Sequence, residues 1–266
     1  MQTAQGRAAS RSSDRSPTAF ADQSRKAIAY RYIQSKIISG ELAAGEPISE
    51  VPLSKAIGIS RTPVREAVGQ LTAEGFLKHL PGRGTVVQLP TRADILELYE
   101  LREALEVYAV GKAARQRLQQ ADSEKLRAVC ETIAALALEL EQTGNQRLDA
   151  ATMGTFLDHD MRFHMLLLRA AGNHRILKVV RDTRLMIRIF HTQREGHDVE
   201  QLREIYRFHK EILDAVQRGD AGQAMSLSGE HIRQSCKERL EAYDRWDRVS
   251  RIRVDDAFLM GLDTDQ

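Results

Sequence analysis

The sequence has only two cysteines among its 266 residues, Cys130 and Cys236. Two cysteines are too few for a disulfide framework, and their separation does not match the spacing of a zinc site, so we expect two free thiols. No run of about 18 apolar residues occurs, and the N-terminus lacks the apolar core of a signal peptide. We therefore expect no membrane span and no export signal, and hence a cytoplasmic protein without a membrane partner.

The local motifs of several enzyme classes are also missing. The sequence contains no HExxH motif of a zinc protease, no nucleophile elbow of a hydrolase and no glycine-rich phosphate loop. These absences weigh against an enzyme, because each of those chemistries needs its residues at a fixed local spacing.

Apolar and charged residues are abundant instead. With 42% hydrophobic residues, a chain of this length can form two domains, each with a core of its own. The net charge is only +2, but residues 1–89 carry +5 and the remainder carries −3. A nucleic-acid-binding part, if the chain has one, is therefore expected in the basic N-terminal third.

Residues 58–75 carry the pattern of a short helix with defined ends. Ser60 can cap its N-terminus, and a glycine stands where a left-handed C-terminal cap is needed. Four apolar residues share one face at helical spacing: Val64, Ala67, Val68 and Leu71. The opposite face and the N-terminal tip present Arg61, Thr62 and Arg65, and such arginines can bind guanine or phosphates in a major groove. Taken alone, an amphipathic helix with two arginines is usually an ordinary solvated helix. Whether this one binds DNA therefore depends on the segments that flank it in the sequence.

The neighbouring segments complete a DNA-reading unit. One amphipathic helix is expected at residues 24–40 and a second, short one at residues 50–57, joined to the third by a glycine-containing turn. Two strand-like segments follow, and the sequence PGRG between them forms a hairpin with a basic tip. Three helices and a hairpin make a winged helix-turn-helix, whose tip residues Gly82, Arg83 and Gly84 can contact a phosphate or the minor groove.

The motifs SRTPVREAVGQLTAEGF and PGRGTVV resemble the DNA-binding domain of the GntR family of bacterial transcription regulators, over about residues 27–89. By this resemblance, Arg61, Thr62 and Arg65 contact bases and phosphates of double-stranded DNA, and the PGRG segment forms the wing tip. Many family members carry another DNA-contacting arginine at the start of the second helix, where this chain has Val51. The resemblance implies a short palindromic operator. Because Val51 removes one expected contact, the base sequence of that operator stays open.

From residue 91 onward the pattern is helical throughout. Six helices are expected, at residues 92–118, 122–143, 148–171, 173–193, 198–218 and 220–246. The fold class is therefore mainly α, with a winged helix-turn-helix at residues 24–90 and an all-helical bundle at residues 91–247. Residues 1–23 are expected to be a disordered tail, and residues 248–266 a C-terminal tail that either packs on the bundle or is disordered.

Three helices of this bundle each carry a possible metal ligand on an apolar stripe. Asp160 and His164 lie one turn apart on the third helix, His209 lies on the fifth and His231 on the sixth. A lone core histidine is usually just a hydrogen-bonded core residue, and the other five histidines get that interpretation. A buried carboxylate with three imidazoles is costly without a cation. One oxygen and three nitrogens suit zinc first, with nickel, manganese or iron as alternatives.

The motifs DMRFH, AAGN, FHKEILDAVQRGD and GEHI resemble the metal-binding form of the FCD domain, the helical effector domain of FadR-type GntR regulators, over about residues 99–240. In that group, the four positions described above hold a metal, and an organic acid commonly completes its coordination. The resemblance also implies that Arg102, which faces inward on the first helix of the bundle, binds the effector's carboxylate. The alternative for Arg102 is a structural ion pair with Glu103 or Glu106.

The sequence therefore predicts a homodimeric transcription regulator, expected to act as a repressor, that responds to a small carboxylic acid. A homodimer is expected because one winged helix offers few contacts, whereas a twofold dimer reads two half-sites. Two alternatives remain open. One is a metal-dependent hydrolytic enzyme with a fused DNA-binding domain. The other is a regulator in which the four polar residues only brace the core.

Overall fold

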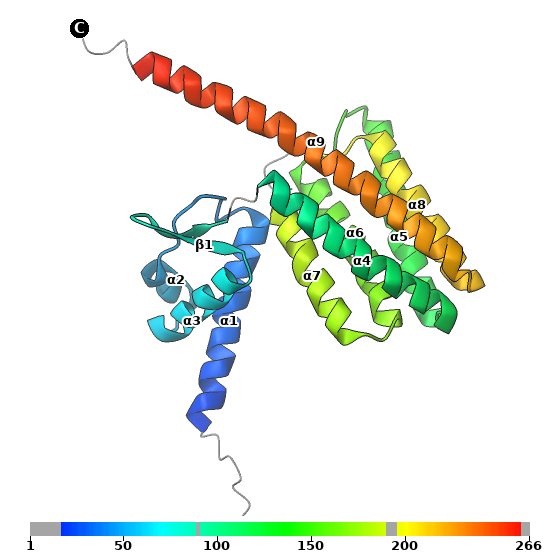
Figure 1. The fold of residues 1–266 in the computed structure, drawn as a ribbon, viewed down its shortest axis with the longest axis horizontal. Helices are drawn as coiled ribbons and strands as arrows, with labels where there is room; N and C mark the ends of the chain where they lie inside the picture. Colours follow the sequence, from blue (N-terminus) through cyan, green and yellow to red (C-terminus); the bar gives the residue numbers. More distant parts are fainter. Residues whose placement is uncertain (1–16, 89–90, 190–195, 262–266) are drawn as a thin grey trace, which may run out of the picture. The chain divides into compact units, whose positions relative to one another are not determined.

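The computed structural model describes the backbone of residues 17–88, 91–189 and 196–261, and the side chains of residues 24–88, 91–188 and 196–248. The chain separates into two compact units, one ending at residue 88 and the other beginning at residue 89. Within the described ranges, the N-terminal unit has three helices and a two-stranded hairpin, and the C-terminal unit has six helices (Figure 1). The mainly α fold, with a winged helix-turn-helix followed by a helical bundle, is the one that the sequence predicts.

The core of the N-terminal unit lies between its first and third helices. Its elements are α1 (Pro17–Ser39), α2 (Glu50–Ile57), α3 (Arg61–Ala73), β1 (Leu77–Leu80) and β2 (Gly84–Val87). The predicted apolar face of α3 is buried, with Val64, Ala67 and Leu71 at 0% exposure and Val68 at 8%. α3 packs against α1, so burial of this face fixes α3 with its polar face outward.

The turn between α2 and α3 depends on a glycine. Gly58 ends α2 in the left-handed conformation, with φ of 75°, which glycine adopts at little steric cost. Ser60 precedes α3 in an extended conformation, but its side chain makes no capping hydrogen bond. The prediction of the helix start was thus right, whereas the predicted cap contact was wrong.

The wing is an antiparallel hairpin in which Leu80 lies opposite Gly84. Gly82 and Gly84 both have φ of 76°, a conformation that other residues rarely adopt, so the tip requires glycine at these positions. The loop before α2 runs along β2 and pairs with it through backbone hydrogen bonds, which the sequence did not indicate. In this pairing the Ile48 amide donates a hydrogen bond of 2.7 Å to the Thr85 carbonyl.

The C-terminal unit is a bundle whose first and last helices lie side by side (Figure 1). Its helices are α4 (Arg92–Gln116), α5 (Gln120–Thr143), α6 (Ala150–Ala170), α7 (His174–Ile189), α8 (Val199–Arg218) and α9 (Ala221–Gly261). Thr91 and Asp94 form a capping box at the start of α4. Capping fixes the first turn of α4, the helix that carries Arg102.

Helices extend into both of the predicted terminal tails. α1 begins at Pro17, so the predicted disorder of residues 1–23 is wrong from residue 17 on, and residues 1–16 lie outside the described part. α9 continues to Gly261, so the predicted tail at residues 248–266 is helical up to that residue, and residues 262–266 lie outside the described part. No glycine or proline occurs between residues 230 and 260, so no strong helix breaker interrupts α9 before Gly261.

Within the described residues, no helix is both long and apolar enough to cross a membrane. Cys130 is buried, Cys236 is partly buried, and both are free thiols, as predicted. Burial raises the pKa of the Cys130 thiol to about 12, which keeps it protonated and unreactive near neutral pH.

Candidate metal centre and ligand cavity

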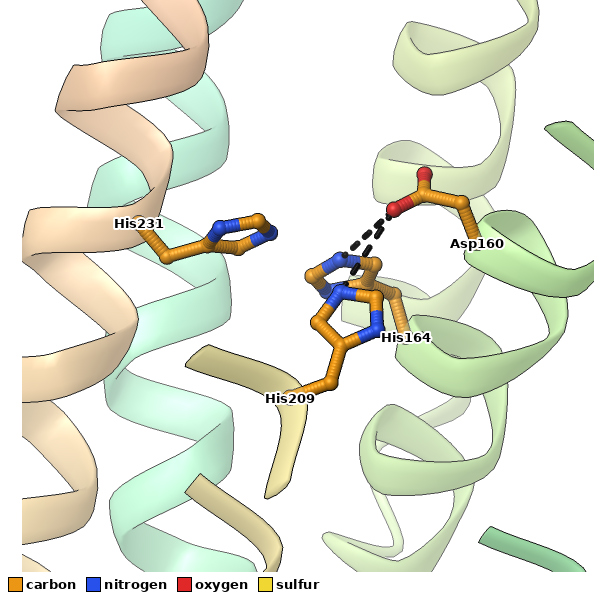
Figure 2. A group of neighbouring side chains, drawn as sticks. All are labelled: Asp160, His164, His209 and His231. Carbon is orange, nitrogen blue, oxygen red and sulfur yellow. Dashed lines mark ion pairs between the residues drawn. The ribbon is translucent and has the colours of Figure 1, made fainter. Parts of the chain in front are cut away.

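Three helices of the C-terminal unit bring the four predicted metal ligands together (Figure 2). Asp160 and His164 lie one turn apart on α6, His209 lies on α8 and His231 on α9. One potential donor atom of each residue lies within 4.8 Å of the others. Asp160 Oδ1 is 3.6 Å from His164 Nε2 and 3.5 Å from His209 Nε2. These four donors surround one small volume, and we call them the His/Asp cluster.

Three nitrogen atoms of the His/Asp cluster are buried without a hydrogen-bond partner among the described residues. They are Nε2 of His164 and both ring nitrogens of His209. Burying a polar group without a partner costs about 1–3 kcal/mol. A cation could take the place of the missing partners, and one carboxylate with three imidazoles is a donor set for zinc, nickel, iron or manganese. The residues therefore fit a divalent transition metal.

The protonation states of three members of the His/Asp cluster, His209, His231 and Asp160, also suit a cation. Burial and the neighbouring His231 and His164 hold the pKa of His209 well below its usual value. Burial and His164 lower the pKa of His231 to about 3. Burial raises the pKa of Asp160, but the neighbouring His164 and the charge of Arg184 outweigh burial and keep that pKa well below its usual value. Neutral imidazoles and an ionised carboxylate are the forms that bind metals.

A second carboxylate orients one of the imidazoles. Glu106 on α4 is 1% exposed at its side chain, and its Oε2 lies 3.1 Å from Nδ1 of His164. Glu106 also accepts hydrogen bonds from Arg102 Nε at 2.8 Å and from Arg184 NH2 at 2.7 Å. Arg184 on α7 donates in addition to Asp160 Oδ2, at 3.2 Å. Because Glu106 holds the Nδ1 edge of His164, the Nε2 edge faces Asp160 and the interior of the cluster.

Sequence reasoning did not find the contact of Glu106 with His164, nor any role for Arg184. A signal for Arg184 was present, because it lies at helical spacing with Val180, Thr183 and Ile187, and all four residues are buried. An arginine on the apolar stripe of α7 needs a buried carboxylate partner. That partner is 78 positions away in the sequence, which hides the pairing from any local pattern.

Arg102 forms the structural ion pair that the sequence left open, and its role in effector binding stays a prediction. It is 3% exposed and forms a buried ion pair with Glu106 at 2.8 Å, which was the structural alternative. It also lines the cavity beside the His/Asp cluster, where the resemblance places an effector-binding arginine. Glu103, the other suggested partner, pairs instead with Arg233 on the surface.

A cavity of about 630 Å³ opens beside the His/Asp cluster, which contributes Asp160 and His231 to its wall. Six arginines and three acidic residues line it: Arg102, Arg147, Arg184, Arg188, Arg239, Arg245, Asp160, Glu204 and Glu238. Excess positive charge in a recessed site attracts anions, and the volume is in the range of small-molecule pockets. The arrangement suits an anionic ligand that reaches the His/Asp cluster.

His197 also lines the cavity, although it showed no distinctive sequence pattern. Its ring meets the ring of Phe156 edge to face, with 4.8 Å between the centroids. Burial and the charge of Arg239 lower its pKa to about 4, so His197 is neutral at physiological pH. A neutral imidazole adds no charge to the wall of the cavity.

The predicted DNA-contacting side chains of α3 are exposed. The side chains of Arg61 and Arg65 are 59% and 64% exposed, and Thr62 is exposed between them. Glu50 at the start of α2 holds Arg65 through bonds of 3.0 Å to Nε and NH2, and it lies 3.6 Å from Arg61. The helix therefore presents its arginines in one orientation, with a carboxylate that DNA must displace or accommodate.

The remaining predicted DNA-contacting residues lie in the wing. Gly82, Arg83 and Gly84 are all exposed at its tip. Val51, which occupies the place of an expected arginine at the start of α2, is 41% exposed. An exposed basic tip on a rigid hairpin suits contact with a phosphate backbone.

Comparison with known protein families agrees with this geometry. The model of the bacterial regulatory proteins of the gntR family matches residues 26–87, which span the helix-turn-helix and the wing. The model of the FCD domain matches residues 97–234, which contain Arg102 and the whole His/Asp cluster.

Individual relatives are similar over most of the chain. An uncharacterised HTH-type transcriptional regulator of Streptomyces ambofaciens is 28% identical, over 77% of this chain and 80% of its own. A probable D-xylose utilisation operon transcriptional repressor of Paenarthrobacter nicotinovorans is 29% identical, over 76% and 82%. The crystal structure of a putative GntR transcriptional regulator from Rhodococcus sp. RHA1 has a TM-score of 0.64 and 25% identity, and covers 83% of this chain and 99% of its own.

These relatives are transcriptional regulators and not enzymes, which removes the support for a hydrolytic function. Both parts of the chain match family models, in the order in which regulators of this kind carry them. The chain therefore belongs to the GntR family of bacterial regulatory proteins, with a GntR helix-turn-helix domain followed by an FCD domain.

Proposed function

We propose that this transcription regulator binds a divalent transition metal at Asp160, His164, His209 and His231, and that a small carboxylic acid bound beside the metal modulates operator binding. The observation that carries the proposal is the His/Asp cluster, with its donor atoms within 4.8 Å of one another and three buried nitrogens that have no hydrogen-bond partner in the part of the chain that the structure describes. Zinc is the first candidate for three imidazoles and one carboxylate, and nickel, manganese and iron are alternatives.

The proposed effector is an anion that reaches the metal through the cavity. A carboxylate oxygen is a ligand for any of these metals, and Arg102 on the cavity wall offers a planar fork of donors to a carboxylate. Arg102 and Glu106 belong to α4, the first helix after the unit boundary at residue 88. An effector that favours one position of α4 can shift the population that binds DNA, by as much as its affinities for the two positions differ.

The regulator is proposed to bind a short palindromic operator as a homodimer. Arg61, Thr62 and Arg65 would enter the major groove, and the wing tip at Gly82, Arg83 and Gly84 would lie against a backbone phosphate or the minor groove. A dimer supplies the second half-site that specific affinity needs. Repression is the proposed mode of action, by similarity to the relative named as a repressor.

Replacement of Arg65 with alanine tests the major-groove contact. If its guanidinium binds a base edge, the variant should lose about 1–3 kcal/mol of binding free energy at the preferred operator and discriminate less at one base pair. The measurement is fluorescence anisotropy with an operator selected from a randomised pool and with its single-base variants.

Replacement of Arg83 with alanine provides the matched comparison at the wing. Loss of a phosphate contact should weaken binding to all sequences alike and reduce the slope of log affinity against log salt by roughly one. Two variants that both bind the operator like the parent protein would contradict the proposed DNA interface.

Replacement of Arg102 with alanine tests effector binding independently of metal binding. Arg184 still neutralises Glu106 in this variant, so the His/Asp cluster should keep its metal. Carboxylate affinity should fall by about tenfold to a hundredfold, the effect of a lost charge-assisted hydrogen bond. Metal content by mass spectrometry and thermal shifts with organic acids measure the two effects, and an unchanged acid response would exclude Arg102 from the effector site.

A further inference from the structure

The cavity is larger than one carboxylate bound to a metal requires. Its volume of about 630 Å³ is within the range of roughly 300–1,000 Å³ that holds whole small-molecule ligands. The His/Asp cluster occupies only one part of its wall, and the wall continues along α9 for several turns. The part of the cavity away from the cluster therefore determines which acids fit.

One face of α9 runs from the His/Asp cluster along the cavity. His231, Ser235, Arg239, Ala242 and Trp246 are spaced by three or four residues and all line the cavity. With a rise of about 1.5 Å per residue, the backbone of Arg239 is roughly 12 Å from that of His231 along the helix. Side chains of a helix lean toward its N-terminus, which brings the guanidinium of Arg239 back toward the cluster.

The positive charge of Arg239 acts on the Tyr99 hydroxyl, which contacts Ser235, one helical turn from His231. The Tyr99 hydroxyl is 3.0 Å from Ser235 Oγ. Burial raises the pKa of that hydroxyl, but the positive charges of Arg239 and Arg102 outweigh burial and lower the pKa. Arg239 is 8% exposed, so its charge acts on a recessed, weakly hydrated space. Arg239, Tyr99 and Ser235 thus combine a buried cation with two hydroxyl groups on the cavity wall.

Two of the three acidic residues that line the cavity, Glu238 and Glu204, have hydrogen-bond or ion-pair partners away from Tyr99 and Ser235. Glu238 accepts hydrogen bonds from Gln234 at 2.9 Å and Gln201 at 3.4 Å. Burial raises the pKa of Glu238, while the charge of the neighbouring Arg239 acts in the opposite direction. Glu204 contacts the exposed Arg207 at 3.7 Å. The two carboxylates are thus engaged with neighbours other than Tyr99 and Ser235.

We propose that Arg239, with the Tyr99 and Ser235 hydroxyls, forms a second anion subsite and that the effector is a small dicarboxylic acid. One carboxylate binds at the His/Asp cluster and the other binds Arg239. The backbones of His231 and Arg239 are roughly 12 Å apart, and their side chains extend into the cavity between them and shorten the gap. Because an extended chain advances roughly 1.2 Å per bond, acids of about four to six carbons are the candidates to span it. This inference rests on the proposed function of the His/Asp cluster, because it takes the first carboxylate to be bound there.

The test compares diacids with acids that lack the second charge. Succinate, glutarate and adipate are each paired with the corresponding monoamide, and binding to the zinc-loaded full chain is measured by calorimetry. Wild-type protein should bind at least one diacid about tenfold to a hundredfold more tightly than its monoamide. Arg239→Gln should remove that preference while keeping its zinc and its affinity for the monoamide.

A matched control is Arg233→Gln, because Arg233 lies on the same helix but is 57% exposed and pairs with Glu103 on the surface. It should keep the diacid preference. Equal affinities of wild-type protein for diacids and monoamides would overturn the second subsite but would not contradict the proposed function. This comparison requires only the wild-type protein. A preference that survives Arg239→Gln would also overturn it. If no acid of either kind binds zinc-loaded protein, both proposals fail.

Discussion

His209→Ala is expected to remove the metal and the effector response together. His209 is 0% exposed, it is the only ligand from α8, and neither of its ring nitrogens has a hydrogen-bond partner among the described residues. Without it, Asp160, His164 and His231 remain, and the cation loses its link to α8. Loss of a direct ligand should exceed the effect of a lost supporting residue, so metal affinity should fall by more than about 100-fold.

The measurement combines metal content by mass spectrometry with operator binding in the presence and absence of organic acids. Operator binding without acid should persist, because α3 and the wing belong to the N-terminal unit. His174→Ala is the control, since His174 is exposed at the start of α7 and outside the cluster.

Chelation of the wild-type protein should reproduce the effect of His209→Ala. A metal that binds only the folded chain stabilises it by mass action, so removal should lower the thermal midpoint of wild-type protein and leave that of the variant unchanged. Wild-type protein that takes up no transition metal on reconstitution would contradict the proposed metal site, as would a His209→Ala variant that retains the metal. Either result would mean that the four polar residues only brace the core.

Periodicity was enough to place each proposed ligand on the inner face of its helix. Asp160 and His164 follow each other by one turn on an apolar stripe, and both His209 and His231 interrupt stripes of their own. Periodicity says nothing, however, about which helices meet. The convergence of α6, α8 and α9 was implied by the resemblance to the FCD domain, and the structure brings the four residues together.

The parts that escaped prediction depend on tertiary contacts or on missing stop signals. Glu106 was considered as a partner of Arg102 because the two are one turn apart, but its contacts with His164 and Arg184 join three different helices. The length of α9 was underestimated because charged residues near its end were interpreted as a tail, although they favour a helix when no glycine or proline intervenes.

Glu106→Gln is expected to weaken the metal site and the fold at once. Glu106 balances two buried arginines, Arg102 and Arg184, and orients His164 through Nδ1. The amide keeps the shape but not the charge, which leaves both guanidinium groups without their shared carboxylate. Breaking a buried ion pair costs about 3–5 kcal/mol, so the free energy of unfolding of metal-free protein should fall by that amount. Metal affinity should fall by about 10–100-fold, because His164 loses the partner that fixes its ring.

Glu103→Gln is the matched control, because Glu103 lies on the same helix and pairs with Arg233 at the surface. That pair should contribute less than about 1 kcal/mol and leave metal affinity unchanged. Urea denaturation of metal-free protein and competition with a chelator measure the two quantities separately. A loss of stability without a loss of metal affinity would make Glu106 a structural counterion of Arg102 and Arg184 alone. A loss of both would mean that the same carboxylate connects α4 and α7 to the His/Asp cluster, which is the connection that an effector needs to act on α4.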